Sequence, residues 1–114
     1  MKKIWIAFIT INLFMIISGC SNDYKYPPGK DTVEIYGDGT YQILSVGTSN
    51  TLYNVKTQED IEKVVYKYKE KKPSVYVIGE SGYTVLNYQT GKIKKYIKMN
   101  EIPTKQRKVF TEIE

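Results

Sequence analysis

The fold is decided by residues 75–98, which read VYVIGESGYTVLNYQTGKIKKYIK. Three runs rich in β-branched and aromatic residues alternate there with two short turns, and the turns end in Gly82 and Gly91. Such runs favour β-strands, and glycine supplies the positive φ that a short hairpin turn requires. The pattern predicts an antiparallel meander. Its strands are expected at residues 75–79, 83–88 and 92–98.

A second group of strand-like runs lies upstream of this meander. Gly37-Asp38-Gly39 separates two of the runs and is a strong hairpin signal, because Gly and Asp tolerate positive φ. Another turn, over residues 47–50, precedes a third short run. We therefore expect three more strands, at residues 32–36, 40–46 and 52–55.

Between the two groups the apolar spacing becomes helical. Four apolar residues recur at i, i+3, i+4 and i+7, namely Ile61, Val64, Val65 and Tyr68. Thr57 and Asp60 match a helix-capping pattern, and Pro73 would end the helix. The predicted fold class is therefore α+β. We expect a small antiparallel sheet of about six short strands in the order βββαβββ, with one amphipathic helix packed on one face.

The C-terminal segment, residues 99–114, fits two descriptions. Residues 107–113 would serve as an edge strand, or the whole segment would be a loosely docked tail. Upstream of the strands, residues 21–32 contain Pro27, Pro28 and Gly29 without periodicity, which is typical of a flexible tether. The expected globular domain thus covers residues 33–98.

The N-terminal residues have the composition of an export signal. Met1 to Lys3 is basic, and residues 4–17 contain no charge. Fourteen helical residues would cover about 21 Å, which is short of the roughly 30 Å hydrocarbon core of a bilayer. A basic start, an apolar stretch of this length and small residues at its end are typical of a secretory signal peptide rather than a spanning helix.

The end of this segment, Ile17-Ser18-Gly19-Cys20, resembles the lipobox of bacterial lipoprotein precursors. The resemblance covers residues 1–20 only. It implies cleavage between Gly19 and Cys20, removal of residues 1–19, and lipid on Cys20, which becomes the first residue of the mature chain. It also implies a lipid-anchored protein on the extracytoplasmic face of the cell membrane, in a Gram-positive or a Gram-negative envelope. Removing residues 1–19 takes away Lys2 and Lys3, so the net charge falls from +5 to +3.

Composition excludes most enzyme chemistry. The chain has no His and one Cys, so it has no imidazole base, no Cys-His or Ser-His pair and no intramolecular disulfide. No catalytic residue, metal site or cofactor is expected, and we expect the protein not to be an enzyme. Nucleic acid is not an expected partner either, because an export signal directs the chain out of the cytoplasm.

The expected activity is therefore binding. The leading hypothesis is a protein partner, as for an accessory, inhibitor or immunity-type module; the alternative is cell-wall carbohydrate or an anionic wall polymer. Eleven tyrosines, which supply contact area with little loss of entropy, are the most unusual part of the composition. The candidate binding surface combines strand tyrosines with neighbouring lysines. It consists of Tyr76, Tyr83, Tyr88, Tyr96, Lys92, Lys94 and Lys95.

Overall fold

The computed structural model describes residues 24–114. Cys20 and Gly19, the predicted lipidation and cleavage sites, lie outside the described residues. The elements are β1 (Thr32–Tyr36), β2 (Tyr41–Val46), β3 (Ser49–Asn54), β4 (Glu59–Lys71), β5 (Ser74–Gly79), β6 (Gly82–Asn87), β7 (Lys92–Tyr96), the 3-10 turn η1 (Met99–Glu101) and the helix α2 (Thr104–Ile113).

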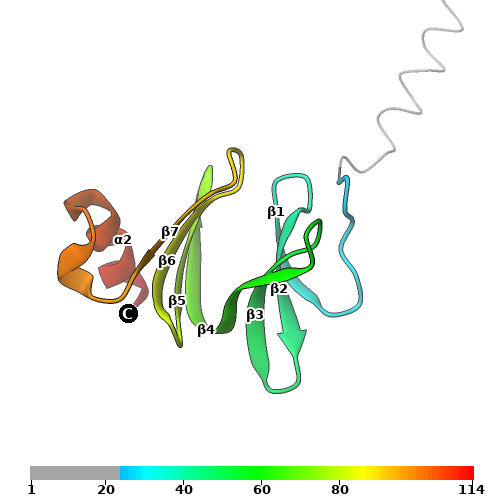
Figure 1. Ribbon diagram of the computed structural model, residues 1–114, viewed down its shortest axis with the longest axis horizontal. Coiled ribbons are helices and arrows are strands. Elements are labelled where there is room, and N and C mark those ends of the chain that lie inside the picture. Colours follow the sequence, from blue (N-terminus) through cyan, green and yellow to red (C-terminus); the bar gives the residue numbers. More distant parts are fainter. Residues whose placement is uncertain (1–23) are drawn as a thin grey trace, which may run out of the picture.

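The seven strands form one antiparallel sheet in which every strand pairs with its neighbour in sequence. Figure 1 shows β1, β2 and β3 on one side of β4, and β5, β6 and β7 on the other, with α2 packed beyond β5–β7. The predicted α+β class, with one antiparallel sheet and one helix packed on it, is confirmed. The sheet has seven strands where about six were expected.

The helix predicted between Thr57 and Pro73 is wrong, because this stretch forms the 13-residue strand β4. A register shift between Val65 and Lys67 inserts a β-bulge into its pairing with β5. In a regular strand, residues three apart face opposite sides. The bulge instead allows Val65 and Tyr68 to pack in the same core. It thereby reproduces within a strand part of the spacing that is typical of a helix.

The inner core lies between the two halves of the curled sheet. Side chains from β1–β3 meet side chains from β5 and β6 across it, with β4 between them. Ile43, Leu52, Val75, Val77 and Leu86 are fully buried there. Each fully buried side chain of this size contributes roughly 1.5–3 kcal/mol. The chain has one Cys and therefore no internal disulfide, so this burial and the pairing of β4 with both β3 and β5 hold the two halves together.

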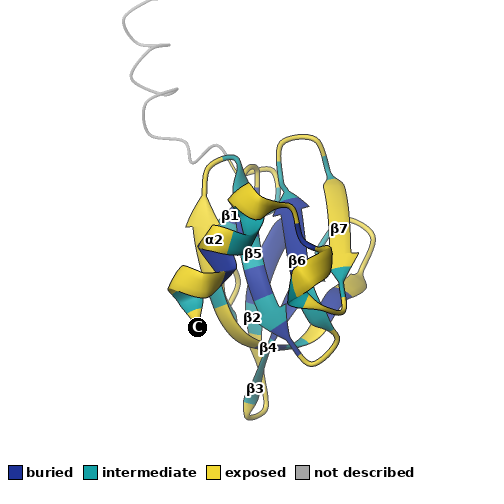
Figure 2. Ribbon diagram, turned by 90° about the vertical axis from the view of Figure 1, so that its left-hand side faces the viewer, coloured by how far each residue is buried: buried dark blue, intermediate teal, exposed yellow. Residues whose placement is uncertain are grey.

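The outer face of β5–β7 is covered by α2. Phe110 is fully buried and packs with Val85 and Ile102, while Tyr76, Tyr83 and Tyr96 pack around them. Figure 2 shows exposed residues on the outer side of α2 and buried ones toward the sheet. Residues 104–113 are thus a docked helix, and neither the edge strand nor the loose tail expected for this segment forms.

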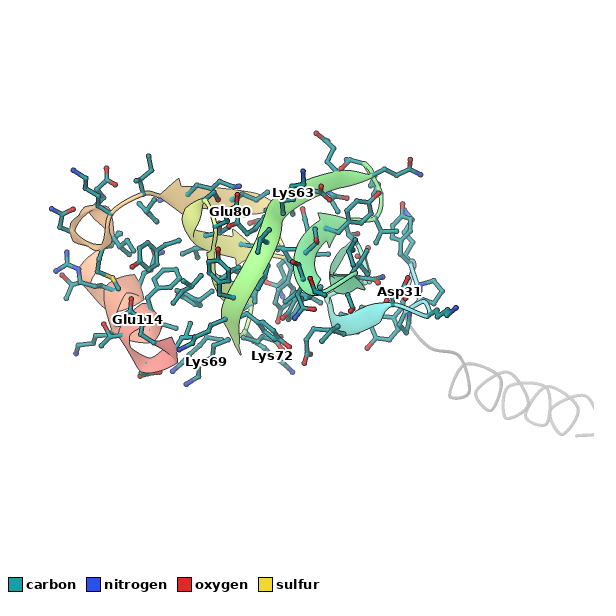
Figure 3. The ribbon with its side chains drawn as sticks, turned by 90° about the horizontal axis from the view of Figure 1, so that it is seen from below. Asp31, Lys63, Lys69, Lys72, Glu80 and Glu114 are labelled. Carbon is teal, nitrogen blue, oxygen red and sulfur yellow. The ribbon has the colours of Figure 1, made fainter. Side chains whose placement is uncertain are left out.

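Lysines of β4 contact the C-terminal end of this helix at the surface. Lys69 Nζ lies 3.0 Å from Glu112 Oε2, Lys71 Nζ lies 3.5 Å from the same oxygen, and Lys67 Nζ donates to the main-chain oxygen of Glu114. Figure 3 shows Glu114 and Lys69 on the same side of the molecule. Exposed pairs of this kind contribute little energy. The helix therefore docks chiefly through the burial of Phe110, and the lysines of β4 lie beside its C-terminal end.

Candidate functional site

Three of the four tyrosines of the predicted binding surface lie beneath α2. The rings of Tyr76 and Tyr83 pack edge-on against Phe110, with centroid separations of 5.4 and 5.1 Å. The Tyr96 hydroxyl donates to Gln106 Oε1 of α2 at 3.4 Å. These rings serve the packing of the helix, so they are not arranged as an open row on the sheet.

The three lysines of the predicted surface lie on both faces of β7. Lys92 and Lys94 border a hollow of about 180 Å³ beside Gln106. Lys95 faces the other way and donates to the main-chain oxygen of Ile61. The structure therefore does not bring the seven predicted residues together on one face. Lys95 borders a separate hollow of about 250 Å³, and Tyr88 borders a cavity of about 540 Å³.

A buried carboxylate lies on the inner side of the sheet, near Lys95. Glu62 is 2% exposed and accepts hydrogen bonds from the main-chain N and the hydroxyl of Ser81. Lys95 Nζ lies 3.9 Å from its Oε2. Gly79 approaches so closely that a Cβ at this position would overlap the Glu62 carboxylate. Glu62 is thus fully engaged in fixing the β5–β6 turn to β4.

A groove lies between three turns of the sheet. It has a volume of about 540 Å³ and is lined by residues of the β1–β2, β3–β4 and β6–β7 turns. These turns are far apart in sequence, yet the curled sheet brings them to the same end of the molecule (Figure 1). A volume of this size falls within the range of small-molecule binding sites.

A second hollow of about 400 Å³ adjoins the first. The two share Gly37, Tyr88 and Gln89, and the second continues past Glu70 to Tyr24. We call the combined feature the hairpin groove. Its lining consists of Gly37, Asp38, Thr40, Tyr41, Asn54, Lys56, Thr57 and residues 88–91, together with Tyr24, Ile35, Glu70, Lys72 and Pro73.

Tyr88 stands at the junction of the two hollows and is held on three sides. Its ring stacks on that of Tyr36 with a centroid separation of 5.7 Å, and its hydroxyl donates to Glu70 Oε2 at 2.5 Å. A Cβ on Gly37 would lie 3.2 Å from the ring, so glycine allows the turn to approach it. The ring of Tyr88 is therefore a fixed aromatic wall.

The turns around this wall are fixed by their own side chains. Asp38 Oδ1 accepts from the main-chain N and hydroxyl of Thr40, and these hydrogen bonds hold the pKa of Asp38 below its usual value. Asn54 Oδ1 accepts from Thr57 N at 3.0 Å. Asn87 Oδ1 accepts hydrogen bonds from the main-chain N atoms of Gln89 and Thr90, in the β6–β7 turn. Such local bonds order the groove before a ligand arrives, which lowers the entropic cost of binding.

The groove is lined by equal numbers of acidic and basic side chains. Its two acidic residues are Asp38 and Glu70, and its two basic residues are Lys56 and Lys72. The remaining polar lining consists of amides and hydroxyls from Asn, Gln, Thr and Tyr. The groove is therefore aromatic and polar without a net charge of either sign.

Within the part of the chain that the structure describes, no group of three or more acidic, His or Cys side chains is placed to hold a metal ion. No helix among residues 24–114 has the length and apolar character to cross a membrane.

No protein family, curated protein or solved structure matches this chain. The groove residues that the sequence did not point to include Tyr41, Asn54, Lys56 and Gln89. The sequence did contain a sign of these residues, because Gly, Asp, Asn and Thr cluster in the three turns that line the groove. Turn composition does not reveal which turns meet, since that depends on the curl of the sheet.

We expect stability to fall in alkali between about pH 10 and 12. Burial, followed by the hydrogen bond to Glu70, raises the pKa of Tyr88 to about 12 from its ordinary 10.0, and burial also raises the pKa of Tyr36. A raised tyrosine pKa stabilises the fold below the unfolded pKa, and this contribution is lost as the pH rises through the folded value. Urea unfolding midpoints at pH 9 and pH 11.5 would measure this loss of stability.

The Tyr88→Phe variant should lose less stability between these two pH values than the wild type. Equal losses would contradict the assignment of the effect to Tyr88.

Proposed function

We propose that this chain is a surface lipoprotein, anchored at the membrane through lipid on Cys20, whose hairpin groove binds an uncharged oligosaccharide. The anchor follows from the lipobox-like sequence of residues 17–20 and the apolar segment before it. Two or more acyl chains give lasting membrane attachment without a spanning helix. The observation that carries the binding proposal is the fixed Tyr88 ring between two polar, charge-balanced hollows.

The lining of the groove matches the chemistry of a sugar chain. Sugar rings present apolar C–H faces that pack on aromatic rings, and hydroxyl groups that both donate and accept hydrogen bonds. Tyr88 supplies the aromatic wall, and the amides of Asn54 and Gln89 each offer a donor and an acceptor. Because the two hollows are continuous, they accommodate more than one sugar ring in a row.

Balanced charge favours an uncharged glycan over an anionic polymer. A site for a polyanion is ordinarily lined by an excess of Lys or Arg, which attracts the ligand and makes binding strongly dependent on salt. Here Asp38 and Glu70 offset Lys56 and Lys72. We therefore expect binding that changes little with ionic strength.

A protein partner is less well supported by the surface. The large exposed apolar side chains are spread over the sheet and its flanking segments, and no single strand collects them. They are Tyr24, Val33, Val46, Tyr66, Ile93 and Ile97. Apolar residues scattered in this way are normal on a soluble domain and do not mark an interface.

The test is titration of the lipidated protein in detergent with neutral oligosaccharides of glucose, galactose and N-acetylglucosamine. At least one series should bind, and Gln89→Ala and Tyr24→Ala should each weaken it about tenfold, which corresponds to about 1.4 kcal/mol. Tyr66→Ala is the matched control, because Tyr66 is a 64%-exposed tyrosine outside the groove.

Two results would contradict this proposal. One is the absence of binding to every neutral oligosaccharide together with salt-sensitive binding to polyglycerol phosphate. The other is binding that Tyr66→Ala weakens as much as Tyr24→Ala does, because the sugar would then lie outside the groove.

A further inference from the structure

The wall of the hairpin groove includes Tyr24, which lies very close to the proposed anchor. Tyr24 is 38% exposed and borders the same hollow as Glu70 and Lys72. It follows Cys20 by four residues in the sequence. Four fully extended residues span at most about 14 Å. Lipid on Cys20 would therefore hold this end of the groove within that distance of the lipidated residue.

The segment that follows Tyr24 is fixed to the domain rather than free. Tyr26 N donates to the main-chain oxygen of Asp38 at 3.0 Å, and Gln42 Nε2 donates to the main-chain oxygen of Tyr26 at 3.2 Å. Gln42 is 2% exposed. Gly39 lies so close to the Tyr26 carbonyl that a Cβ there would overlap it. The last residues of the predicted tether therefore belong to the folded domain, which limits how far the groove can turn away from the anchor.

The chain enters the domain at the same end as the groove. In Figure 1 the first described residues, drawn in light blue, lie at the upper end, as do the β1–β2 and β6–β7 turns. Those turns supply much of the groove lining. With lipid on Cys20, the short reach from that residue would place the groove next to the headgroup region of the bilayer, which is roughly 5–7 Å deep on each side of the hydrocarbon core.

We propose that the hairpin groove binds the sugar of a neutral glycolipid carried by the same membrane. This inference rests on the proposed lipid at Cys20 and on the proposed glycan binding. A sugar on a lipid stays at the height of the groove, and two partners confined to one surface meet at a high effective concentration. A cell-wall glycan is not held at the membrane surface and therefore lacks this high effective concentration.

The experiment uses lipidated protein in phosphatidylcholine vesicles. The vesicles contain diglucosyl, digalactosyl or di-N-acetylglucosaminyl diacylglycerol with a fluorescent acyl chain, or the same labelled lipid without sugar. An acceptor dye is attached through Thr48→Cys, in the exposed β2–β3 turn and away from the groove. At least one glycolipid should give energy transfer above the sugar-free lipid. Gln89→Ala should reduce its binding about tenfold, and Tyr66→Ala should leave it unchanged.

A spacer variant separates this inference from the proposed function. Insertion of about twelve Gly and Ser residues after Asn22 gives the domain a long flexible tether. Binding of the free disaccharides should stay the same, because the groove is intact. Binding of the membrane-held glycolipid should weaken roughly tenfold, because effective concentration falls as a tether lengthens beyond the span of the sites.

The possible outcomes are distinct. In one outcome, the free disaccharides bind in a way that depends on Gln89, but no glycolipid gives energy transfer, or the spacer leaves the transfer unchanged. This outcome would overturn the glycolipid inference and leave the glycan proposal standing. Failure of every free and lipid-linked sugar to bind would overturn both. Transfer that depends on Gln89 and weakens with the spacer would support both.

Discussion

Replacing Cys20 by serine is expected to abolish incorporation of labelled fatty acid into the protein. The lipobox-like sequence implies a thioether on the Cys20 sulfur, and serine has no thiol to form it. Because the chain has no second cysteine, no other thiol would replace it. Growth of the producing bacterium with labelled palmitate, followed by precipitation of the protein, measures the effect directly.

A matched variant, Ser21→Ala, changes the neighbouring residue without altering Ile17 to Cys20 and should retain the label. Membrane fractionation alone is a weaker readout, since an uncleaved apolar segment at residues 4–17 would also associate with lipid. Continued labelling of the Cys20→Ser protein would refute the lipobox assignment. It would also remove the basis for placing the groove near the bilayer.

The Phe110→Ala variant should lower the free energy of unfolding by about 3–5 kcal/mol, the usual cost of truncating a buried phenylalanine. Phe110 is fully buried and its ring contacts those of Tyr76 and Tyr83. It is the largest side chain that joins α2 to the sheet. Small domains are typically stable by about 5–15 kcal/mol, so this loss is a large fraction of the total. Urea unfolding followed by circular dichroism would measure it.

Ile97→Ala is the control for this experiment. Ile97 is also a large apolar residue near the C-terminal end, but it is 79% exposed, so its truncation should change stability by no more than about 0.5 kcal/mol. A loss below about 1 kcal/mol for Phe110→Ala would mean that α2 is not docked through this side chain.

Most strands could be predicted from the sequence because each is short, β-rich and bounded by turn residues. β1 was predicted at its observed bounds, and β5, β6 and β7 at nearly the observed ones. β4 was missed because its apolar residues have helical spacing. A β-bulge changes the face on which the following residues lie, and the order of apolar residues in the sequence does not reveal it. Two signals favoured a strand there, the β-branched and aromatic run at residues 64–68 and the alternating lysines at 67, 69 and 71.

The helix α2 was missed although its apolar residues have helical spacing. Val109, Phe110 and Ile113 recur at i, i+1 and i+4 on the side that packs toward the sheet. An apolar stripe this short does not by itself distinguish a helix from the edge strand that we expected at residues 107–113. The helix is stabilised chiefly by contact with the outer face of β5–β7, which tertiary packing creates. The candidate site depends on tertiary structure in the same way. Tyr88 was identified from the sequence, but its partners Tyr36, Gly37 and Glu70 come from distant strands and turns.

The order of the strands in the sheet has a consequence for how the chain folds. Because each strand pairs with the one before it, every new strand finds its partner already present, and no segment waits for a distant one. Closing short loops costs less entropy than closing long ones and favours rapid folding. A chain that emerges N-terminus first would build the half that carries β1–β3 before β5 appears. The helix α2, which hides the last apolar face, would be added at the end.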